Sequence, residues 1–382
     1  MTNSRIYLSI AHPSGKEKQY ISEAIDSNWI TTAGPQIVRF EKALESYLDT
    51  PKPVVTLSSG TAALHLALID LGVQPGDEII CQDLTFIATI NPVKYVQANP
   101  ILVDSEKDTW NISPDLLEET IKDRMKKTGK KPKAVIAVDL YGMPSRLPEI
   151  IRIAANYEIP VIEDAAESLG SYITINNQRK FCSTFGDYGY ISFNGNKIIT
   201  ASTGGALLCR DEAQAANIRF LSGQAKDSAP HYQHSQLGYN YNLSNICAAI
   251  GLAQMEVLTN YVERRREIHF LYRSELSGHP ELEFQNEMAD FFSNYWLTCV
   301  VFPNETLRDE VKKYLEMNQI ESRPVWKPMH LQPLYEDSPY YGTKFGEYLF
   351  RRGLCLPSSS ILTDEDVKNI ATLINNYLKD HL

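Results

Sequence analysis

The stretch "PVVTLSSGTAALHLALIDLG" (residues 53–72) predicts a buried strand, a turn of small residues and a helix, in that order. The strand, residues 53–57, is apolar, and the helix that follows is apolar around its whole circumference, which is typical of an interior helix. Gly72 suits the left-handed position at which many helices end. A buried strand that leads directly into a buried helix is the building unit of α/β folds.

The same alternation continues through the first 250 residues. Helix-like segments at residues 115–125 and 147–158 separate strand-like segments at residues 100–104, 133–142 and 160–166. The run "KAVIAVDLYG" (133–142) is continuously apolar, as expected of a strand that is covered on both faces of a parallel sheet. We therefore expect an α/β fold whose large domain, residues 1–250, contains a mostly parallel sheet.

The pattern changes near residue 250. Residues 245–276 predict one long amphipathic helix, which is suited to joining two domains. A short strand (295–302) and two helices (305–318 and 363–380) follow it. This mixture predicts a second, smaller α+β domain over residues 251–382.

Composition narrows the possible partners and the compartment. The net charge of −10 argues against nucleic acid as a partner. No apolar run is long enough to span a bilayer, and the N-terminus lacks the apolar core of a signal peptide, so we expect a cytoplasmic protein without a membrane partner. The six cysteines and eight histidines form neither CxxC nor HExxH, which favours buried free thiols and no metal site.

An anion-binding turn is the first of four chemical features in the large domain. "SSGTAAL" (58–64) joins a strand to the start of a helix, where small residues and the helix dipole favour a bound anion. Thr61 adds a hydroxyl. An ordinary turn with a helix cap is the alternative. The segment matches neither the P-loop nor GxGxxG, which argues against a nucleoside triphosphate enzyme and a nicotinamide dehydrogenase.

The next two features also follow strands. Phe86, in "DLTFIATINP" (83–92), can stack on a flat heterocycle or belong to the core. Asp164, in "VIEDAAESLG" (161–170), stands at the carboxyl end of a strand, where α/β sheets bind ligands. Because a lone buried carboxylate is costly, Asp164 needs a partner, either a protonated pyridine nitrogen or structural hydrogen bonds.

The fourth feature is Lys197, in the apolar stretch "YISFNGNKIITASTGGALL" (190–208). Desolvation disfavours the ammonium form of a lysine and frees its amine to attack a carbonyl. Ser192 offers a second hydroxyl to an anion. An anion turn, a stacking aromatic ring, a carboxylate and an amine together predict a pyridoxal phosphate site in which Lys197 and Asp164 are catalytic.

Several motifs also resemble the DegT/DnrJ/StrS family of nucleotide-sugar aminotransferases. They are "SSGTAALHLAL", "TFIAT", "VIEDAAESLGS", "SFNGNK", "GYNYNLSN" and "RPVWKPMH", and the likeness extends from about residue 6 to the C-terminus. It implies the aspartate-aminotransferase fold, pyridoxal phosphate fold type I, and a homodimer with active sites at the subunit interface. "SFNGNKIIT" and "QAKDSAPHYQHSQLGYNY" are similar to the UDP-4-keto-6-deoxy-N-acetylglucosamine aminotransferases of bacillosamine-type pathways.

The resemblance assigns roles to individual residues. It implies that Lys197 bonds to the cofactor aldehyde, that Asp164 meets the ring nitrogen, and that Phe86 stacks on the ring. Glu167 matches a polar partner of the ring hydroxyl. The residues implied to hold the phosphate are Thr61, Ala62 through its backbone, Ser192 and, from the second subunit, Asn240. The residues implied to line the sugar site are Thr31, Thr32 and His330.

Two positions bear on how far the resemblance extends. Asn242 stands where the family commonly has an arginine after "GYNY", which puts a charged contact from this position in doubt. Lys197 stands where the dehydratase branch of the family has histidine, which favours amine transfer.

Because a sugar nucleotide is dianionic and the protein is acidic, Arg323 and Lys327 are candidate cations for the substrate, although both are equally plausible as ordinary surface charges.

These inferences predict a specific reaction. An amino group would pass from L-glutamate to C4 of a UDP-4-keto-6-deoxy-N-acetylhexosamine, for bacterial glycan or glycoprotein synthesis. The same chemistry on another nucleotide sugar is an alternative, either a GDP-4-keto-6-deoxymannose that gives a perosamine-type product or a 3-keto sugar. A non-catalytic protein that senses a nucleotide sugar is the alternative from another class.

Overall fold

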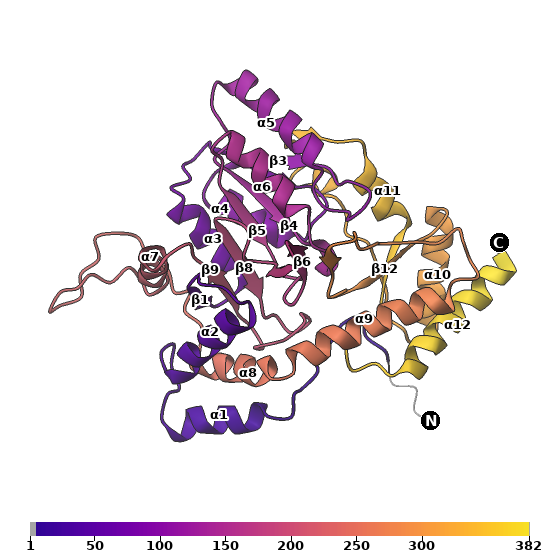
Figure 1. The fold of residues 1–382 in the computed structure, drawn as a ribbon, viewed down its shortest axis with the longest axis horizontal. Coiled ribbons are helices and arrows are strands. Elements are labelled where there is room, and N and C mark those ends of the chain that lie inside the picture. The colour runs from indigo at the N-terminus through magenta and orange to yellow at the C-terminus, as the bar shows by residue number, and fades with distance from the viewer. Residues whose placement is uncertain (1–4, 382) are drawn as a thin grey trace.

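The computed structural model describes residues 5–381 and contains a central eight-stranded sheet (Figure 1). Its strand order is β1-β9-β8-β5-β4-β2-β3-β14, and only β9 runs antiparallel to its neighbours. The strands are β1 (Val54–Leu57), β2 (Glu78–Gln82), β3 (Asn99–Val103), β4 (Ala134–Val138), β5 (Val161–Asp164), β8 (Tyr188–Ser192), β9 (Gly205–Leu208) and β14 (Tyr340–Tyr341). The predicted mostly parallel sheet is confirmed.

Helices cover both faces of this sheet because its buried strands present apolar side chains alternately to each face. Ile79 and Cys81 of β2 pack on one side with α3 (Gly60–Asp70), α4 (Asn91–Tyr95) and α7 (Glu212–Ser222). Ile80 packs on the other side with α5 and α6. The helices on that side are α5 (Pro114–Thr128), α6 (Leu147–Asn156), α2 (Pro35–Tyr47) and α8 (Asn245–Met255), with α1 (Glu17–Asp26) outside α8.

The strand, turn and helix predicted from residues 53–72 are present as β1 and α3. Ser59 caps α3, because its hydroxyl accepts the Ala62 N–H at 3.0 Å. Every residue of α3 from Ala62 to Leu68 is buried, as its all-round apolar sequence predicts. Gly72, just past the helix, has the expected positive φ of 66°.

A second, antiparallel sheet lies beyond α9 (Leu258–Glu275), which runs from α8 towards α10 and α12 in Figure 1. Its order is β10-β12-β15-β13, and its strands are β10 (Glu283–Phe284), β12 (Thr298–Val301), β15 (Gly353–Leu356) and β13 (Arg323–Pro324). The helices of this region are α10 (Glu305–Met317), α11 (Phe345–Arg352) and α12 (Asp364–His381). A third sheet has the order β11-β6-β7, with β11 (Phe291–Phe292), β6 (Tyr172–Ile175) and β7 (Gln178–Phe181).

The single helix predicted over residues 245–276 is wrong, because the chain forms two helices there. Val257, between α8 and α9, has φ −117° and ψ 2°. The residues just before it are held by the N-terminal segment: Gln254 donates to the His12 carbonyl at 2.9 Å, and Glu256 pairs with Lys16. These contacts stabilise the break, and a local helical pattern cannot reveal them.

The division of the chain at residue 250 stays a prediction. Two strands that lie beyond it pair with strands that lie before it, β11 with β6 and β14 with β3. Within residues 5–381, no helix combines the length and the apolar character that a membrane crossing requires.

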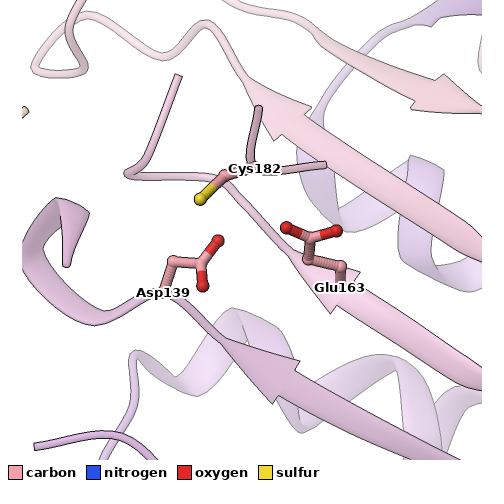
Figure 2. Close-up of side chains that lie close together, drawn as sticks. All are labelled: Asp139, Glu163 and Cys182. Carbon is pink, nitrogen blue, oxygen red and sulfur yellow. The ribbon is translucent and has the colours of Figure 1, made fainter. Parts of the chain in front are cut away.

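A buried group of Asp139, Glu163 and Cys182 supports the ends of β4 and β5 (Figure 2). Asp139 accepts hydrogen bonds from Ser145 and Ser168, and Glu163 accepts the Ser183 N–H at 2.6 Å. Burial raises the pKa of both carboxyls, and the charge of Asp139 raises that of Glu163 further. Protein donors therefore satisfy these carboxyls, which fasten the loop after β7 to the sheet.

Gly205 of β9 allows the start of α3 to lie directly on the sheet. A Cβ at this position would stand 2.4 Å from the Gly60 nitrogen and 2.5 Å from the Ser59 carbonyl carbon. We expect Gly205→Ala to lower the free energy of unfolding by about 1–3 kcal/mol, because backbone atoms cannot move aside as a side chain would. Thermal denaturation measures this change.

Gly278→Ala is the matched control, since a Cβ there has no atom within 4 Å. Equal stability of the two variants would contradict this account of Gly205.

Candidate active site

A cavity of about 490 Å³ opens at the carboxyl ends of the parallel strands. Val138 ends β4, Asp164 ends β5 and Ser192 ends β8, and all three line it. The other wall comes from the C-terminal part of the chain and includes Trp296 and Arg323. This edge of a parallel sheet is where α/β proteins bind ligands, so the cavity is the candidate active site.

Lys197 places its amine inside this cavity. Its Nζ lies 3.2 Å from Glu167 Oε1 and 4.1 Å from the centroid of the Trp296 ring, and its side chain is only 12% exposed. Burial raises the pKa of Glu167 to about 7, although the charge of Lys197 acts in the opposite direction. Lys197 is therefore an enclosed amine beside a carboxyl group, as a catalytic role requires, and not a surface lysine.

Asp164 lies at the same edge of the sheet and is held by hydrogen bonds. Its Oδ2 accepts the Thr89 hydroxyl at 2.6 Å, and its Oδ1 accepts the Ala166 N–H at 3.1 Å. Burial raises the pKa of Asp164, while hydrogen bonds from Thr89 and Tyr190 act in the opposite direction. A protonated pyridine nitrogen bound in the cavity would also favour the charged form of Asp164.

Small residues at the start of α3 form another part of the cavity wall. Ser59, Gly60 and Thr61 line it together with Ser192. The Ala62 N–H, which the resemblance assigns to the phosphate, instead donates to Ser59 Oγ. Thr61 and Ser192 thus line the cavity, whereas the Ala62 N–H is bonded within the helix cap.

Aromatic rings and one cation complete the cavity. Phe86 is 52% exposed, and its ring centroid lies 5.5 Å from that of Trp326. An accessible ring at this position fits stacking on a heterocycle better than packing in the core. Arg323 also lines the cavity, where it pairs with Glu321 at 2.7 Å. Lys327 is not among the lining residues.

His330 is not among the residues that line the cavity, and its implied place beside the sugar stays a prediction. Its Nδ1 is 2.7 Å from Asp83 Oδ2, its Nε2 is 3.3 Å from Glu347 Oε1, and its ring stacks on Tyr340. Burial favours a lower pKa for His330, but Asp83 and Glu347 raise it above the ordinary value. In this chain, His330 is held between two carboxylates.

Three other expected residues also lie outside the cavity lining. Thr31, Thr32 and Asn240 are exposed in this chain. Asn242, the departure from the family pattern, accepts the Ser222 hydroxyl at 2.7 Å and so has an internal structural contact. None of these four residues is among those that line the cavity of their own chain.

Several residues that line the cavity are not among those predicted from the sequence. Thr89 lines the cavity and lies in the quoted "TFIAT" motif, so its hydroxyl could have been predicted from the sequence as a site residue. Trp296 carries no local signal, because a buried tryptophan in a strand-like segment normally belongs to the core. Trp326 lies in the quoted "RPVWKPMH" motif, which was a signal for it as "TFIAT" was for Thr89. The contacts of the two tryptophans with Lys197 and Phe86 join segments about 100 or more residues apart, which only the fold reveals.

The donor set of the cavity fits pyridoxal phosphate. An enclosed amine, a hydrogen-bonded carboxylate, a helix N-terminus with hydroxyls and an accessible aromatic ring line one space. Lys197 would bond to the aldehyde, Asp164 would face the ring nitrogen, and Thr61 with Ser192 would hold the phosphate.

Comparison with known proteins gives the same result. Residues 13–375 match the model of the DegT/DnrJ/EryC1/StrS aminotransferase family. The chain is 46% identical over 368 residues to the Bacillus subtilis protein named "Putative pyridoxal phosphate-dependent aminotransferase EpsN", covering 95% of this chain and 93% of the relative. It is 37% identical over 376 residues to the GDP-perosamine synthase of Escherichia coli O157:H7, covering 98% and 99%.

A solved structure extends the likeness to three dimensions. The pyridoxal phosphate form of the "Putative sugar aminotransferase Spr1654" from Streptococcus pneumoniae superposes with a TM-score of 0.90 at 25% identity, covering 99% of this chain and 100% of that one. The expected aminotransferase fold and cofactor are thereby confirmed, and the alternative of a non-catalytic sensor is wrong. The chain belongs to the DegT/DnrJ/EryC1/StrS aminotransferase family and is a pyridoxal phosphate-dependent sugar aminotransferase.

Proposed function

We propose that the protein moves an amino group from L-glutamate to C4 of UDP-4-keto-6-deoxy-N-acetylhexosamine, for glycan or glycoprotein synthesis. The observation that carries the amine transfer is the enclosure of Lys197 and Asp164 in one cavity. The similarity of residues 192–200 and 224–241 to enzymes of bacillosamine-type pathways supports the UDP-linked substrate. The GDP-perosamine synthase at 37% identity supports a second candidate, a GDP-linked 4-keto sugar.

The residues of the cavity have separate tasks in this proposal. Bound pyridoxal phosphate supplies an aldehyde that accepts the amino group and a ring that draws electrons from the adjacent carbon. Lys197 Nζ, once free, carries the proton to and from the α-carbon of glutamate and C4 of the sugar, since an amine beside a carboxyl group can both accept and donate it. Asp164 keeps the ring nitrogen protonated.

The sugar nucleotide would enter past Arg323. Its guanidinium stands at the cavity with its side chain 66% exposed, so it can meet a diphosphate although the protein is acidic overall. The rings of Phe86 and Trp326, whose centroids lie 5.5 Å apart, form an apolar part of the cavity wall. Arg323 therefore acts in binding, away from the atoms that react.

We also propose that two copies assemble into a homodimer. Thr31, Thr32 and Asn240 lie in segments that expose large apolar side chains, among them Ile30 (61% exposed), Tyr232 (82%) and Leu237 (78%). A second copy would cover this apolar surface and bring these three polar residues to the partner cavity.

Six cysteines without disulfides support a cytoplasmic location for this dimer, with no membrane partner.

Replacing Lys197 tests the covalent role of its amine. Lys197→Ala is expected to keep the fold and to lose covalent cofactor, because no other lysine among residues 5–381 lines the cavity. Borohydride reduction of the holoenzyme followed by peptide mapping locates the label, which should be on Lys197 alone. Lys126→Ala, at an exposed position of α5, is the control and should still be labelled. A label on a different lysine would overturn the assignment.

Replacing Asp164 separates binding from chemistry. Asp164→Asn keeps an oxygen for the Ala166 N–H, so the fold and the bound cofactor should remain. The loss of charge beside the ring should lower kcat by a factor on the order of 10² or more. Asp187→Asn is the control, because Asp187 contacts the opposite end of β5 through the Val161 N–H. A wild-type rate in Asp164→Asn would remove the residue from this role.

The substrate is tested directly. Purified holoenzyme with L-glutamate is offered UDP- and GDP-linked 4-keto-6-deoxy sugars and a 3-keto sugar nucleotide, and product masses are read. The proposal expects an amino sugar from the UDP-linked N-acetyl substrate. Product from the GDP-linked sugar alone would keep the mechanism and replace the substrate by the second candidate. The Lys197→Ala protein, which should give no product, controls for non-enzymatic amination.

A further inference from the structure

Two cysteines face each other across the small sheet. Cys299 of β12 and Cys355 of β15 are partners in the antiparallel ladder, and their Sγ atoms lie 3.4 Å apart. Both side chains are buried. Their thiols are in contact without being bonded.

The register of the ladder allows a disulfide at this position. The Phe302 N–H donates to the Arg352 carbonyl at 2.9 Å, which makes those two residues a hydrogen-bonded pair. Because the pattern alternates along an antiparallel ladder, Cys299 and Cys355, three steps away, form a non-hydrogen-bonded pair. The Cα atoms of such a pair are about 4.5 Å apart, inside the range of roughly 4.4–6.8 Å that disulfides span. A disulfide can thus form by rotation of the side chains alone.

Only one of the two cysteines lies at the cavity wall, although both side chains are just 1% exposed. Cys355 lines the main cavity, in company with Lys197 and Glu167, and it is the only one of the six cysteines that does. Cys299 lies behind it, where burial raises the pKa of its thiol well above the ordinary value. A small neutral oxidant that enters the cavity therefore meets Cys355 first.

We propose that Cys355 and Cys299 form a redox pair in the wall of the main cavity, which a small peroxide closes to a disulfide. The Cys355 sulfur attacks one oxygen of hydrogen peroxide, the O–O bond breaks, and the thiol proton leaves with the second oxygen as water. The resulting sulfenic acid is attacked by the Cys299 sulfur, which forms the S–S bond and releases a second water. Two thiols lose two electrons, and the peroxide gains them.

The position of Cys355 sets when this reaction can occur. Cofactor bound in the cavity occupies the space through which peroxide must pass, so oxidation should be fast in cofactor-free protein and several-fold slower in holoenzyme. The pair would then report whether the cavity is filled. This property is separate from the amine transfer and does not depend on which sugar is the substrate.

The test compares holoenzyme and cofactor-free protein exposed to hydrogen peroxide. Remaining thiols are alkylated, and the protein is digested without reductant for mass spectrometry. The proposal expects a peptide that links Cys299 to Cys355, formed several-fold faster without cofactor and opened again by a dithiol reductant. Equal rates in the two forms would overturn the cavity route, and absence of the linked peptide while Cys247 is oxidised would overturn the pair.

Variants identify the order of attack. Cys299→Ser should leave sulfenic acid at Cys355, which a dimedone-type reagent traps, whereas Cys355→Ser should leave Cys299 unoxidised. Cys247→Ser is the matched control, because Cys247 is half-buried and lies outside the cavity lining, and it should still give the linked peptide. Circular dichroism confirms that each variant is folded. Trapped sulfenic acid at Cys299 in Cys355→Ser would contradict the proposed order.

Discussion

The cost of removing charges from water is the constraint on which the site depends. Lys197, Glu167 and Asp164 are largely buried at one edge of a sheet, and each would be expensive there without a partner. The fold provides partners from neighbouring elements: the Tyr141 N–H for Glu167 and the Thr89 hydroxyl for Asp164. These contacts fix the side chains before any cofactor arrives, which is the preorganisation that catalysis requires.

Parallel strands explain why the groups meet. β4, β5 and β8 are neighbours in the sheet and run in one direction, so their carboxyl ends share an edge. The start of α3 comes to the same edge because Gly205 lets its backbone lie against β9. An amine, a carboxylate and a turn of small residues from separate parts of the chain therefore face one space.

The C-terminal region closes that space. Trp296 and Trp326 cover the amine and the stacking ring, and Arg323 adds a cation at the opening. The strand β15 supplies Cys355 to the same wall, which places an oxidisable sulfur next to the reacting groups. Binding, shielding and the redox pair therefore all depend on how the small sheet lies against the large one.

The sequence by itself determined the α/β fold and marked Lys197 and Asp164 as candidate site residues, because strand and helix periodicity and the chemistry of residues that follow strands are local properties. Tertiary structure alone decided the contact of Lys197 with Glu167 and Trp296, the break between α8 and α9, and the burial of His330 between Asp83 and Glu347. Each of these depends on residues distant in the chain. Their contacts arise from packing, which no local pattern encodes.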